Sequence, residues 1–384
     1  VFFFICCVPK TVVGESSQSA PLVTSDNSEV PARPEAAITL ENDNFSLGID
    51  PGSGAILSLV IKKKHCDMIG EKRLQANFRI CLPLPDYQAN YIEGMEQRPV
   101  AVSKSGNVVT VHFKGMRSPQ GEFPLDLSYT ITLDGDQIRF RSKLTNHSKE
   151  PVSEFWFPRL GGWTNFGNDR NSVVTVPEYG NCSHLSLFNG FPGSRSFGTE
   201  AAEWSVNYPL LQMPWLDIYS GQSNTGLYLG YHDDIYRLST WHFNLYPTVS
   251  GRFPAWLTSE QVNGDPVGLI FSHVRYPFIQ NGETLDSGDF IIRVHPGDWH
   301  TGSLFYRKWF TDRWPVDKSD RWLRKKSAWF SSIIYQPEDK IIADYNRYGQ
   351  WCREAFDHAG IDCYELIGWD SGGLERNYPD YTPE

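Results

Sequence analysis

Alternation of apolar and polar residues with a period of two runs from residue 37 to residue 300 and constrains the fold more than any other feature. Val108–Phe113, Leu127–Leu133 and Gln137–Leu144 show the pattern, and turn residues such as Asp134–Asp136 separate such segments. Successive side chains of a strand point to opposite faces, so the pattern predicts half-buried strands. Many strands at short spacing predict an antiparallel sandwich, and the length of the region predicts two large packed sheets.

The first hairpin can be placed in detail. Phe45–Asp50 and Ala55–Val60 alternate, and the turn segment Pro51–Gly54 lies between them. Glycine reaches the backbone angles of a tight turn at low steric cost, so these residues predict two antiparallel strands joined by a turn. Phe290–His295 is predicted to close the set of strands.

The pattern changes after Trp299. Thr301–Trp314 places aromatic residues at helical spacing and predicts a helix, and the charged segment Lys318–Lys326 predicts a connection. Ser327–Tyr335 then predicts an apolar strand. Pro337 follows at a position that predicts the first turn of a second helix, because proline is tolerated there.

The second helix carries an apolar face, which predicts that it packs on a sheet. Its apolar or small residues recur in steps of four and three, at Ile341, Tyr345, Tyr348, Cys352, Ala355 and Ala359. Gly360 stands where a C-terminal cap belongs, and Ile361–Trp369 predicts another strand. Strand, helix and strand form one βαβ unit, which requires parallel pairing.

These segments predict a mainly β chain in four parts. We expect a signal-peptide remnant and linker at residues 1–36, a large antiparallel β-supersandwich at 37–300, a helical linker at 301–326, and the truncated start of a (β/α)8 barrel at 327–384. One βαβ unit cannot close a barrel, and the sequence starts without Met. We therefore expect a piece of a longer protein.

The N-terminal segment predicts export. Val1–Val8 is apolar but too short to span a bilayer, which is typical of the end of a signal peptide. Gly14–Ala36 has the composition of a linker. We expect a secreted, periplasmic or envelope-associated protein without a transmembrane segment, and leave open whether Cys6 or Cys7 carries a lipid. The seven Cys include no C-x-x-C pair, so neither a zinc ribbon nor a redox pair is indicated.

The charge excludes some partners. A net charge of −10 argues against nucleic acid and anionic membranes, which need clustered Lys and Arg. Lys62–Lys64 is a single short basic run, expected to be a solvated hairpin end. Aromatic residues make up 14% of the chain, and two interpretations stay open: they stack on sugar rings or fill the core of the sandwich.

Several stretches, taken in their order along the chain, carry a family resemblance. They are Asn44–Leu47 with the Gly52–Gly54 turn, Met213–Tyr219, Gly226–Asp233, Gly297–His300 leading into Tyr306–Trp309, and Gly368–Asp370 leading to Tyr378–Tyr381. This order resembles the galactose-mutarotase-like supersandwich that precedes the TIM barrel in several glycoside hydrolase families, near the α-galactosidases and endo-α-N-acetylgalactosaminidases. The resemblance implies a carbohydrate substrate and a catalytic carboxylate pair on later barrel strands, beyond residue 384, so no catalytic residue is assigned.

The loop after the last predicted strand supplies the candidate substrate-binding residues. Asp370 follows that strand directly, and in a barrel such residues face the active-site mouth. A carboxylate there accepts hydrogen bonds from sugar hydroxyls, and Trp369 could stack on the sugar. Arg376, Tyr378 and Asp380 lie on the same loop. The alternatives are a turn role for Asp370, capping the Gly372–Gly373 loop, and a packing role for Trp369.

Other polar segments have weaker signals. His232-Asp233-Asp234 ends a strand and suits either a calcium ion or a polar hairpin end; otherwise no cofactor and no metal site are predicted. Asp298–His300 is expected to be structural, at the start of the linker helix. Glu154–Trp163 mixes tryptophan, arginine and glycine, and either meets the barrel or forms core.

Three functions follow, and the first is preferred. The chain is the N-terminal part of a glycoside hydrolase; or it is a carbohydrate-binding protein without catalysis; or it is a mutarotase-like epimerase or a polysaccharide lyase. Mutarotases use a His and a Glu for proton transfer, and the spacing of residues in this sequence identifies no such pair.

Overall fold

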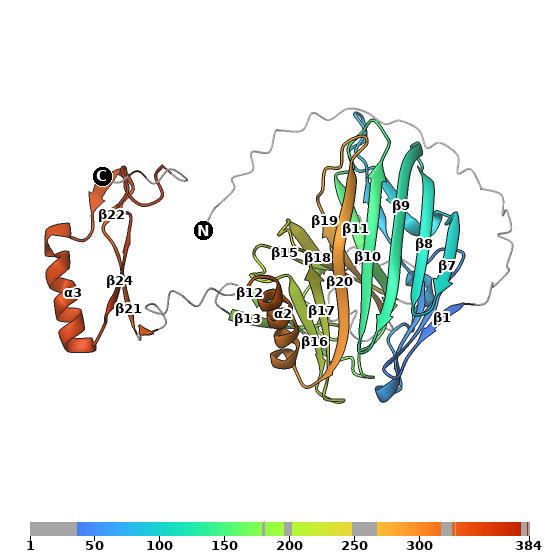
Figure 1. Cartoon of the computed structure of the whole chain (residues 1–384), viewed down its shortest axis with the longest axis horizontal. Coiled ribbons are helices and arrows are strands. Elements are labelled where there is room, and N and C mark those ends of the chain that lie inside the picture. The colour runs from blue at the N-terminus through green and yellow to red at the C-terminus, as the bar shows by residue number, and fades with distance from the viewer. Residues whose placement is uncertain are drawn as a thin grey trace, which may run out of the picture. The chain divides into compact units, whose positions relative to one another are not determined.

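The computed structural model describes residues 37–178, 181–195, 202–247, 267–315, 325–326, 328–377 and 382. The predictions for residues 1–36, and for most of the connection after residue 315, lie outside these ranges. Figure 1 shows a large body of strands and a smaller body with a single long helix. The chain divides into two compact units after Gly302, inside the helix that follows the sandwich, and each unit is described by itself.

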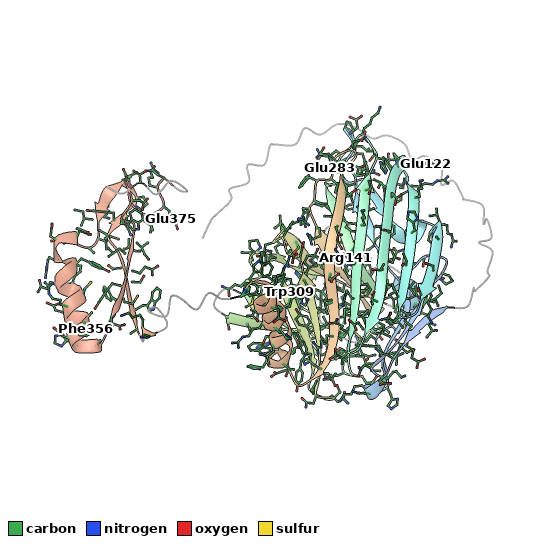
Figure 2. The ribbon with its side chains drawn as sticks, viewed as in Figure 1. Glu122, Arg141, Glu283, Trp309, Phe356 and Glu375 are labelled. Atoms are coloured by element: carbon green, nitrogen blue, oxygen red, sulfur yellow. The ribbon has the colours of Figure 1, made fainter. Side chains whose placement is uncertain are left out.

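The first unit contains a nine-stranded antiparallel sheet among the described residues. Its charged exposed face includes Arg141, whose guanidinium pairs with Asp286 at 3.1 Å (Figure 2). The strand order is β13 (Asn181–Ser186), β12 (Val173–Glu178), β16 (Trp215–Ser220), β17 (Thr225–His232), β20 (Thr284–Pro296), β10 (Gln137–Asn146), β9 (Gly121–Asp134), β8 (Val108–Ser118) and β7 (Ala101–Ser105).

Two further sheets complete this unit. The seven-stranded sheet runs β14 (Ser194–Arg195), β15 (Ala202–Tyr208), β18 (Ser239–Pro247), β19 (Val267–Arg275), β11 (Glu154–Trp163), β5 (Arg79–Cys81) and β6 (Tyr91–Glu93). The four-stranded sheet runs β1 (Ile38–Glu41), β2 (Phe45–Ile49), β3 (Ile56–Ile61) and β4 (Cys66–Asp67). Every pairing within these sheets is antiparallel, so the predicted large antiparallel sandwich is confirmed.

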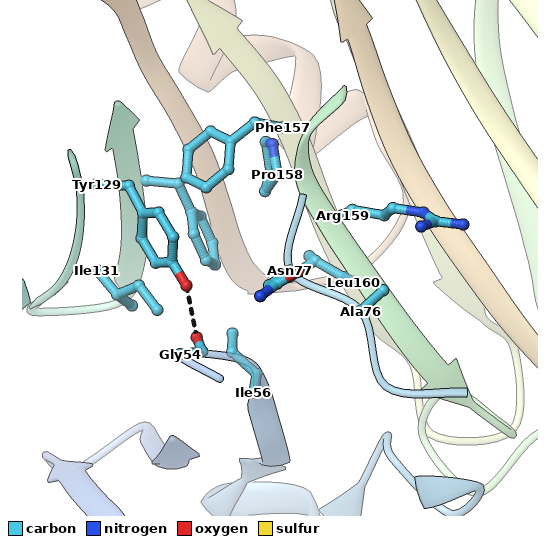
Figure 3. A pocket seen from close by; sticks show the side chains of 11 residues that line it. Gly54, Ile56, Ala76, Asn77, Tyr129, Ile131, Phe157, Pro158, Arg159 and Leu160 are labelled. Carbon is cyan, nitrogen blue, oxygen red and sulfur yellow. Dashed lines mark hydrogen bonds between the residues drawn. The ribbon is translucent and has the colours of Figure 1, made fainter. Parts of the chain in front are cut away.

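The predicted first hairpin is also confirmed. Strands β2 and β3 pair antiparallel across the Pro51–Gly54 turn. Gly54 has φ +73°, and a Cβ there would lie 2.2 Å from the Tyr129 hydroxyl, which donates to the Gly54 carbonyl at 2.9 Å. Figure 3 shows this hydrogen bond beside a small cavity between the sheets. The turn therefore needs glycine for its backbone angle and for the approach of Tyr129.

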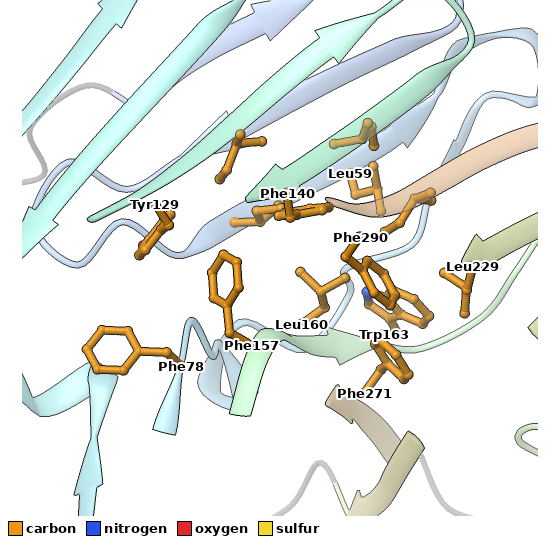
Figure 4. Packing of buried hydrophobic residues seen from close by; sticks show 14 of the residues in the cluster. Leu59, Phe78, Tyr129, Phe140, Phe157, Leu160, Trp163, Leu229, Phe271 and Phe290 are labelled. Carbon is orange, nitrogen blue, oxygen red and sulfur yellow. The ribbon is translucent and has the colours of Figure 1, made fainter. Parts of the chain in front are cut away.

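Aromatic side chains join the two large sheets. The ring of Trp241 lies 5.5 Å from that of Phe290, and Phe271 lies 5.6 Å from Phe290. Trp163 is fully buried and stacks on Phe271 at 6.1 Å, and Figure 4 shows these rings packed together. Each such side chain contributes roughly 1.5–3 kcal/mol by leaving water. Part of the aromatic content therefore fills the core, as one interpretation proposed.

The end of the sandwich passes into α2 (Trp299–Arg313), which agrees with the predicted helix to within two residues. Asp298 lies just before the helix, where its carboxylate accepts from the His300 backbone N–H at 3.1 Å and contacts the His300 ring at 2.9 Å. These contacts cap the start of the helix, so Asp298–His300 has the expected structural role.

The second unit holds the predicted βαβ arrangement. Strands β21 (Trp329–Ile333) and β24 (Cys363–Ile367) pair in parallel, and α3 (Tyr345–Ala359) lies between them in the chain. Gly360 caps α3 in the left-handed conformation, with φ 65°. A short antiparallel pair, β22 (Tyr335–Gln336) with β23 (Lys340–Ile341), precedes the helix.

The predicted start of this helix was wrong. Pro337 opens a separate 3-10 turn, Pro337–Asp339, and α3 starts eight residues later. Asp344 is its N-cap, because the Asp344 carboxylate accepts from the Asn346 backbone N–H at 2.9 Å. Asp at the N-cap satisfies an unpaired donor of the first turn, which is a stronger start signal than proline. Among the described residues, no helix is long and apolar enough to cross a membrane.

Candidate functional site

Asp370 lies three residues after the end of β24, at the carboxyl end of a parallel strand. Its side chain is 2% exposed, and Oδ2 has no hydrogen-bond partner within the described part of the chain. The loop turn is closed by the backbone, because the Asp370 carbonyl accepts from the Gly373 N–H at 3.0 Å. A buried carboxylate oxygen without a partner is costly, so Asp370 stays a candidate to accept a hydrogen bond from a substrate.

The other predicted substrate-binding residues differ in where they lie. Trp369 is 41% exposed, as a side chain available for stacking would be. Arg376 is exposed in the same loop, and its backbone N–H donates to the Gly373 carbonyl at 3.1 Å. Tyr378 and Asp380 lie outside the described residues. The structure therefore brings Asp370, Trp369 and Arg376 into one short loop.

A second polar site, which we call the outer face, covers the side of the seven-stranded sheet away from the core. It arises from alternation, since Phe155 and Phe157 of β11 are buried in the core while the residues between and beside them point the other way. Its members are Arg79 (β5), Tyr91 and Glu93 (β6), Glu154, Trp156 and Arg159 (β11), Glu203 (β15), and His242 and Asn244 (β18).

The strand register places these residues side by side. Trp156 is the cross-strand partner of Arg79, and Arg79 is the partner of Glu93. On the other side of β11, Arg159 and His242 both pair with the same residue of β19, Ser272. Residues that pair across neighbouring strands lie about 4.5–5.5 Å apart at Cβ, so one continuous polar surface results.

Aromatic rings and guanidinium groups interleave on the outer face. The Arg79 guanidinium lies 5.0 Å from the Tyr91 ring and 5.1 Å from the Trp156 ring. The Trp156 ring lies 5.2 Å from the His242 ring. Trp156 Nε1–H donates to Glu154 Oε2 at 2.7 Å. Half-buried aromatic rings whose polar atoms are held in place are typical of surfaces that bind sugars.

Glu93 pairs with both arginines. Its Oε2 accepts from Arg159 at 2.7 Å, and its Oε1 lies 2.5 Å from Arg79. Burial alone would raise the pKa of Glu93, but Arg159 and Arg79 outweigh it and lower the pKa below its usual value. The carboxylate is therefore ionised at neutral pH, and it fixes the positions of the two guanidinium groups.

His242 stands beside a carboxylate. Burial lowers the pKa of His242 below its usual value, and the negative charge of Glu203 opposes that shift. Asn244 donates its amide N–H to Glu203 at 3.1 Å. An imidazole that is neutral at pH 7 next to a fixed carboxylate is suited to accept and return protons.

The segment His232-Asp233-Asp234 has protein partners in place of a metal. The Asp233 carboxylate pairs with Arg275 at 3.1 Å and with Arg237 at 3.4 Å. Burial lowers the pKa of His232 to about 3, and its ring contacts the Tyr228 hydroxyl at 2.9 Å. Within the described ranges, no group of three or more His, Cys, Asp or Glu side chains could hold a metal ion; calcium at this place stays a prediction.

The cavity in Figure 3 is not a ligand site. It holds about 10 Å³ and is lined by core residues such as Ile131, Phe140 and Leu160. A space of this size takes at most one water molecule.

No family model matches the sequence, and no curated protein matches it either. Among solved structures, the α-N-acetylgalactosaminidase NagBb from Bifidobacterium bifidum is similar with a TM-score of 0.57 and 10% identity, over 90% of this chain and 54% of that one. The chain thus spans about half of that enzyme's length. The covered share of this chain is larger than its first unit, so the likeness in fold extends into the second.

Shorter proteins also match in structure. A galactose mutarotase related enzyme from Lactobacillus acidophilus has a TM-score of 0.42 and 10% identity, over 67% of this chain and 97% of that one. A putative aldose 1-epimerase from Escherichia coli has a TM-score of 0.42 and 11% identity, over 68% of this chain and 99% of that one.

Sequence reasoning missed the outer face. The alternation at the start of Glu154–Trp163 was the available signal, because it separates Glu154 and Trp156 from the core residues Phe155 and Phe157. Arg159 joins the outer face through the register shift between Trp156 and Arg159, which alternation does not predict. Of the two interpretations of this segment, core formation holds for Trp163, which is fully buried. The partners in β5, β6, β15 and β18 lie far away in the chain, and only the strand register brings them together.

Proposed function

We propose that this chain forms part of a secreted glycoside hydrolase, whose sandwich precedes a (β/α)8 barrel that binds the sugar at its rim. Asp370 carries the proposal: a buried carboxylate, with one oxygen that has no partner among the described residues, stands at the carboxyl end of a parallel strand. In barrel enzymes, substrates bind at these strand ends. The similar fold of an α-N-acetylgalactosaminidase over most of this chain supports the proposal.

In this proposal Asp370 orients the substrate and does not break the bond. Its Oδ2 accepts a hydrogen bond from a sugar hydroxyl. Such a hydrogen bond is shorter and stronger when the acceptor is a charged carboxylate. Trp369 presents an exposed ring to a sugar face. The two carboxyl groups that cleave a glycosidic bond are proposed to lie on later barrel strands, beyond residue 384.

Hydrolysis of aryl glycosides by the natural gene product that contains this chain tests the proposal. We expect activity on at least one aryl α-glycoside, and a loss of at least tenfold in kcat/KM for Asp370→Asn. The matched control is Asp357→Asn on the exposed side of α3, which should change kcat/KM less than twofold. The proposal fails if no glycoside is cleaved, or if both variants behave alike.

The outer face favours a second candidate function, sugar anomerisation. Opening an aldose ring needs one group to take the proton of the anomeric hydroxyl and another to protonate the ring oxygen. His242 and Glu203 interact on adjacent strands, and the Trp156 ring beside them would hold the sugar. Polarimetry of α-galactose and α-glucose tests this: His242→Gln should abolish any acceleration that His184→Gln, on β13, retains. Absence of acceleration by the parent chain rejects it.

A further inference from the structure

One end of the sandwich contains a cleft of about 560 Å³, within the size range of small-molecule sites. Five separate segments of the first unit build it: the residue before β2, the end of β3 with the turn after it, the β9–β10 turn, the start of β17, and the end of β20. The lining residues are Asn44, Ile61, Lys63, Lys64, Asp136, Asn224, Thr225, Val294, His295 and Pro296. We call it the lysine cleft.

Two of the cations around this cleft are already neutralised. Lys62 pairs with Glu41 at 2.8 Å, outside the lining. Arg293 forms two contacts with Asp136, at 2.7 and 2.8 Å. Asp136, the single carboxylate among the lining residues, is therefore paired with the Arg293 guanidinium. It does not offset the charges of Lys63 and Lys64.

Lys63 and Lys64 keep their charge toward the cleft. Lys64 Nζ donates to the Ser223 backbone carbonyl at 2.7 Å, which holds the ammonium in place without cancelling its charge. Neither lysine has an ion-pair partner among the residues that the structure describes. Two ammonium groups on one wall create a positive site in a chain whose net charge is −10, and such a site concentrates anions.

One lining residue, His295, is held in place by its contacts. His295 is 5% exposed, and its ring contacts Asp217 Oδ2 at 2.7 Å and the Pro296 carbonyl at 3.2 Å. Gly226 makes room for that ring, since a Cβ there would lie 2.0 Å from His295 Cε1. A lining residue that is already held in place lowers the ordering cost of binding a ligand.

We propose that the lysine cleft binds a sugar that carries an anionic substituent, a carboxylate or a sulfate ester. The anion lies between Lys63 and Lys64, and the amides of Asn44 and Asn224 contact the hydroxyls. This site belongs to the sandwich, shares no lining residue with the outer face or the Asp370 loop, and does not depend on hydrolysis.

Isothermal titration calorimetry of the full chain with glucuronate, glucose 6-sulfate, glucose and inorganic sulfate tests the proposal. Glucuronate or glucose 6-sulfate should bind at least tenfold more tightly than glucose, and more weakly as salt is added, because salt screens exposed charges. Comparing the affinities of the two anionic sugars shows whether the cleft prefers a carboxylate or a sulfate ester. Binding of inorganic sulfate without either sugar would overturn the sugar proposal.

Charge-matched variants separate the cleft from a general effect of net charge. Lys63→Met/Lys64→Met should weaken binding of the preferred anionic sugar at least tenfold, and Lys64→Met alone at least threefold. Lys62→Met removes the same charge from the same turn, yet Lys62 is already paired, so it should change the affinity less than twofold. Circular dichroism melting checks that all variants fold. Equal binding by the Lys62 and Lys64 variants, or no binding of either anionic sugar to the parent, rejects the proposal.

Discussion

Replacing Glu93 by Gln removes the charge that holds the outer face together. Arg159 is 7% exposed, and Glu93 is the carboxylate that pairs with it. Breaking a buried pair by removing one partner costs about 3–5 kcal/mol, because the other charge stays buried and unpaired. The Glu93 side chain is 28% exposed, so partial solvation places the expected loss at about 3 kcal/mol.

The pH dependence of this loss is a sharper test than its size. The pKa of Glu93 is lowered in the folded protein from its ordinary value of 4.5, so the ion pairs contribute fully above that value. Their contribution is lost as the pH falls through the folded-state pKa. The stability difference between parent and Glu93→Gln should therefore be large at pH 7 and shrink below pH 4.5.

Urea denaturation followed by circular dichroism at pH 7 and at pH 3.5 measures both quantities. Glu122→Gln is the control, because Glu122 pairs with Arg117 where the side chains are 72% and 77% exposed, and exposed pairs contribute at most about 1 kcal/mol. A loss below 1 kcal/mol for Glu93→Gln at pH 7, or a loss that is the same at both pH values, would refute the argument that Glu93 pairs with the buried charge of Arg159.

Two further predictions concern the core of the sandwich. Gly226→Ala should destabilise the chain by more than about 2 kcal/mol in urea denaturation, because the new Cβ would lie 2.0 Å from the His295 ring and 2.7 Å from the Gly297 carbonyl. The control is Gly221→Ala, which should be nearly neutral, because the nearest atom to a Cβ at Gly221 lies 3.9 Å away. His273→Phe should raise the melting temperature at pH 5 by a few degrees (about 1 kcal/mol), because the His273 ring is fully buried with both nitrogens unpaired among the described residues. Burial holds the pKa of His273 well below 6.5, so the parent loses stability as the pH falls below 6.5 and the variant should lose less.

Local patterns in the sequence predicted the elements well where one physical requirement dominated. The alternation of apolar and polar residues predicted the strands. Gly360 predicted the end of α3, because glycine adopts the left-handed conformation of a C-terminal cap more easily than other residues. The start of α3 was placed wrongly because Pro337 and Asp344 both suit a helical first turn. Only the pairing of Tyr335–Gln336 with Lys340–Ile341 shows that the chain turns back before the helix starts.

The candidate sites also differ in whether local patterns in the sequence could predict them. The place of Asp370 after a parallel strand could be predicted, because it depends only on the strand that precedes it; its role stays a prediction. The outer face could not be predicted, because its residues come from five strands and become neighbours only through the register of the sheet. Strand β11 makes the connection: Phe155 and Phe157 supply core on one side, while Trp156 and Arg159 supply the polar surface on the other. Because a shift of register by one residue would exchange these sides, the packing that stabilises the sandwich also determines which side chains its outer face presents.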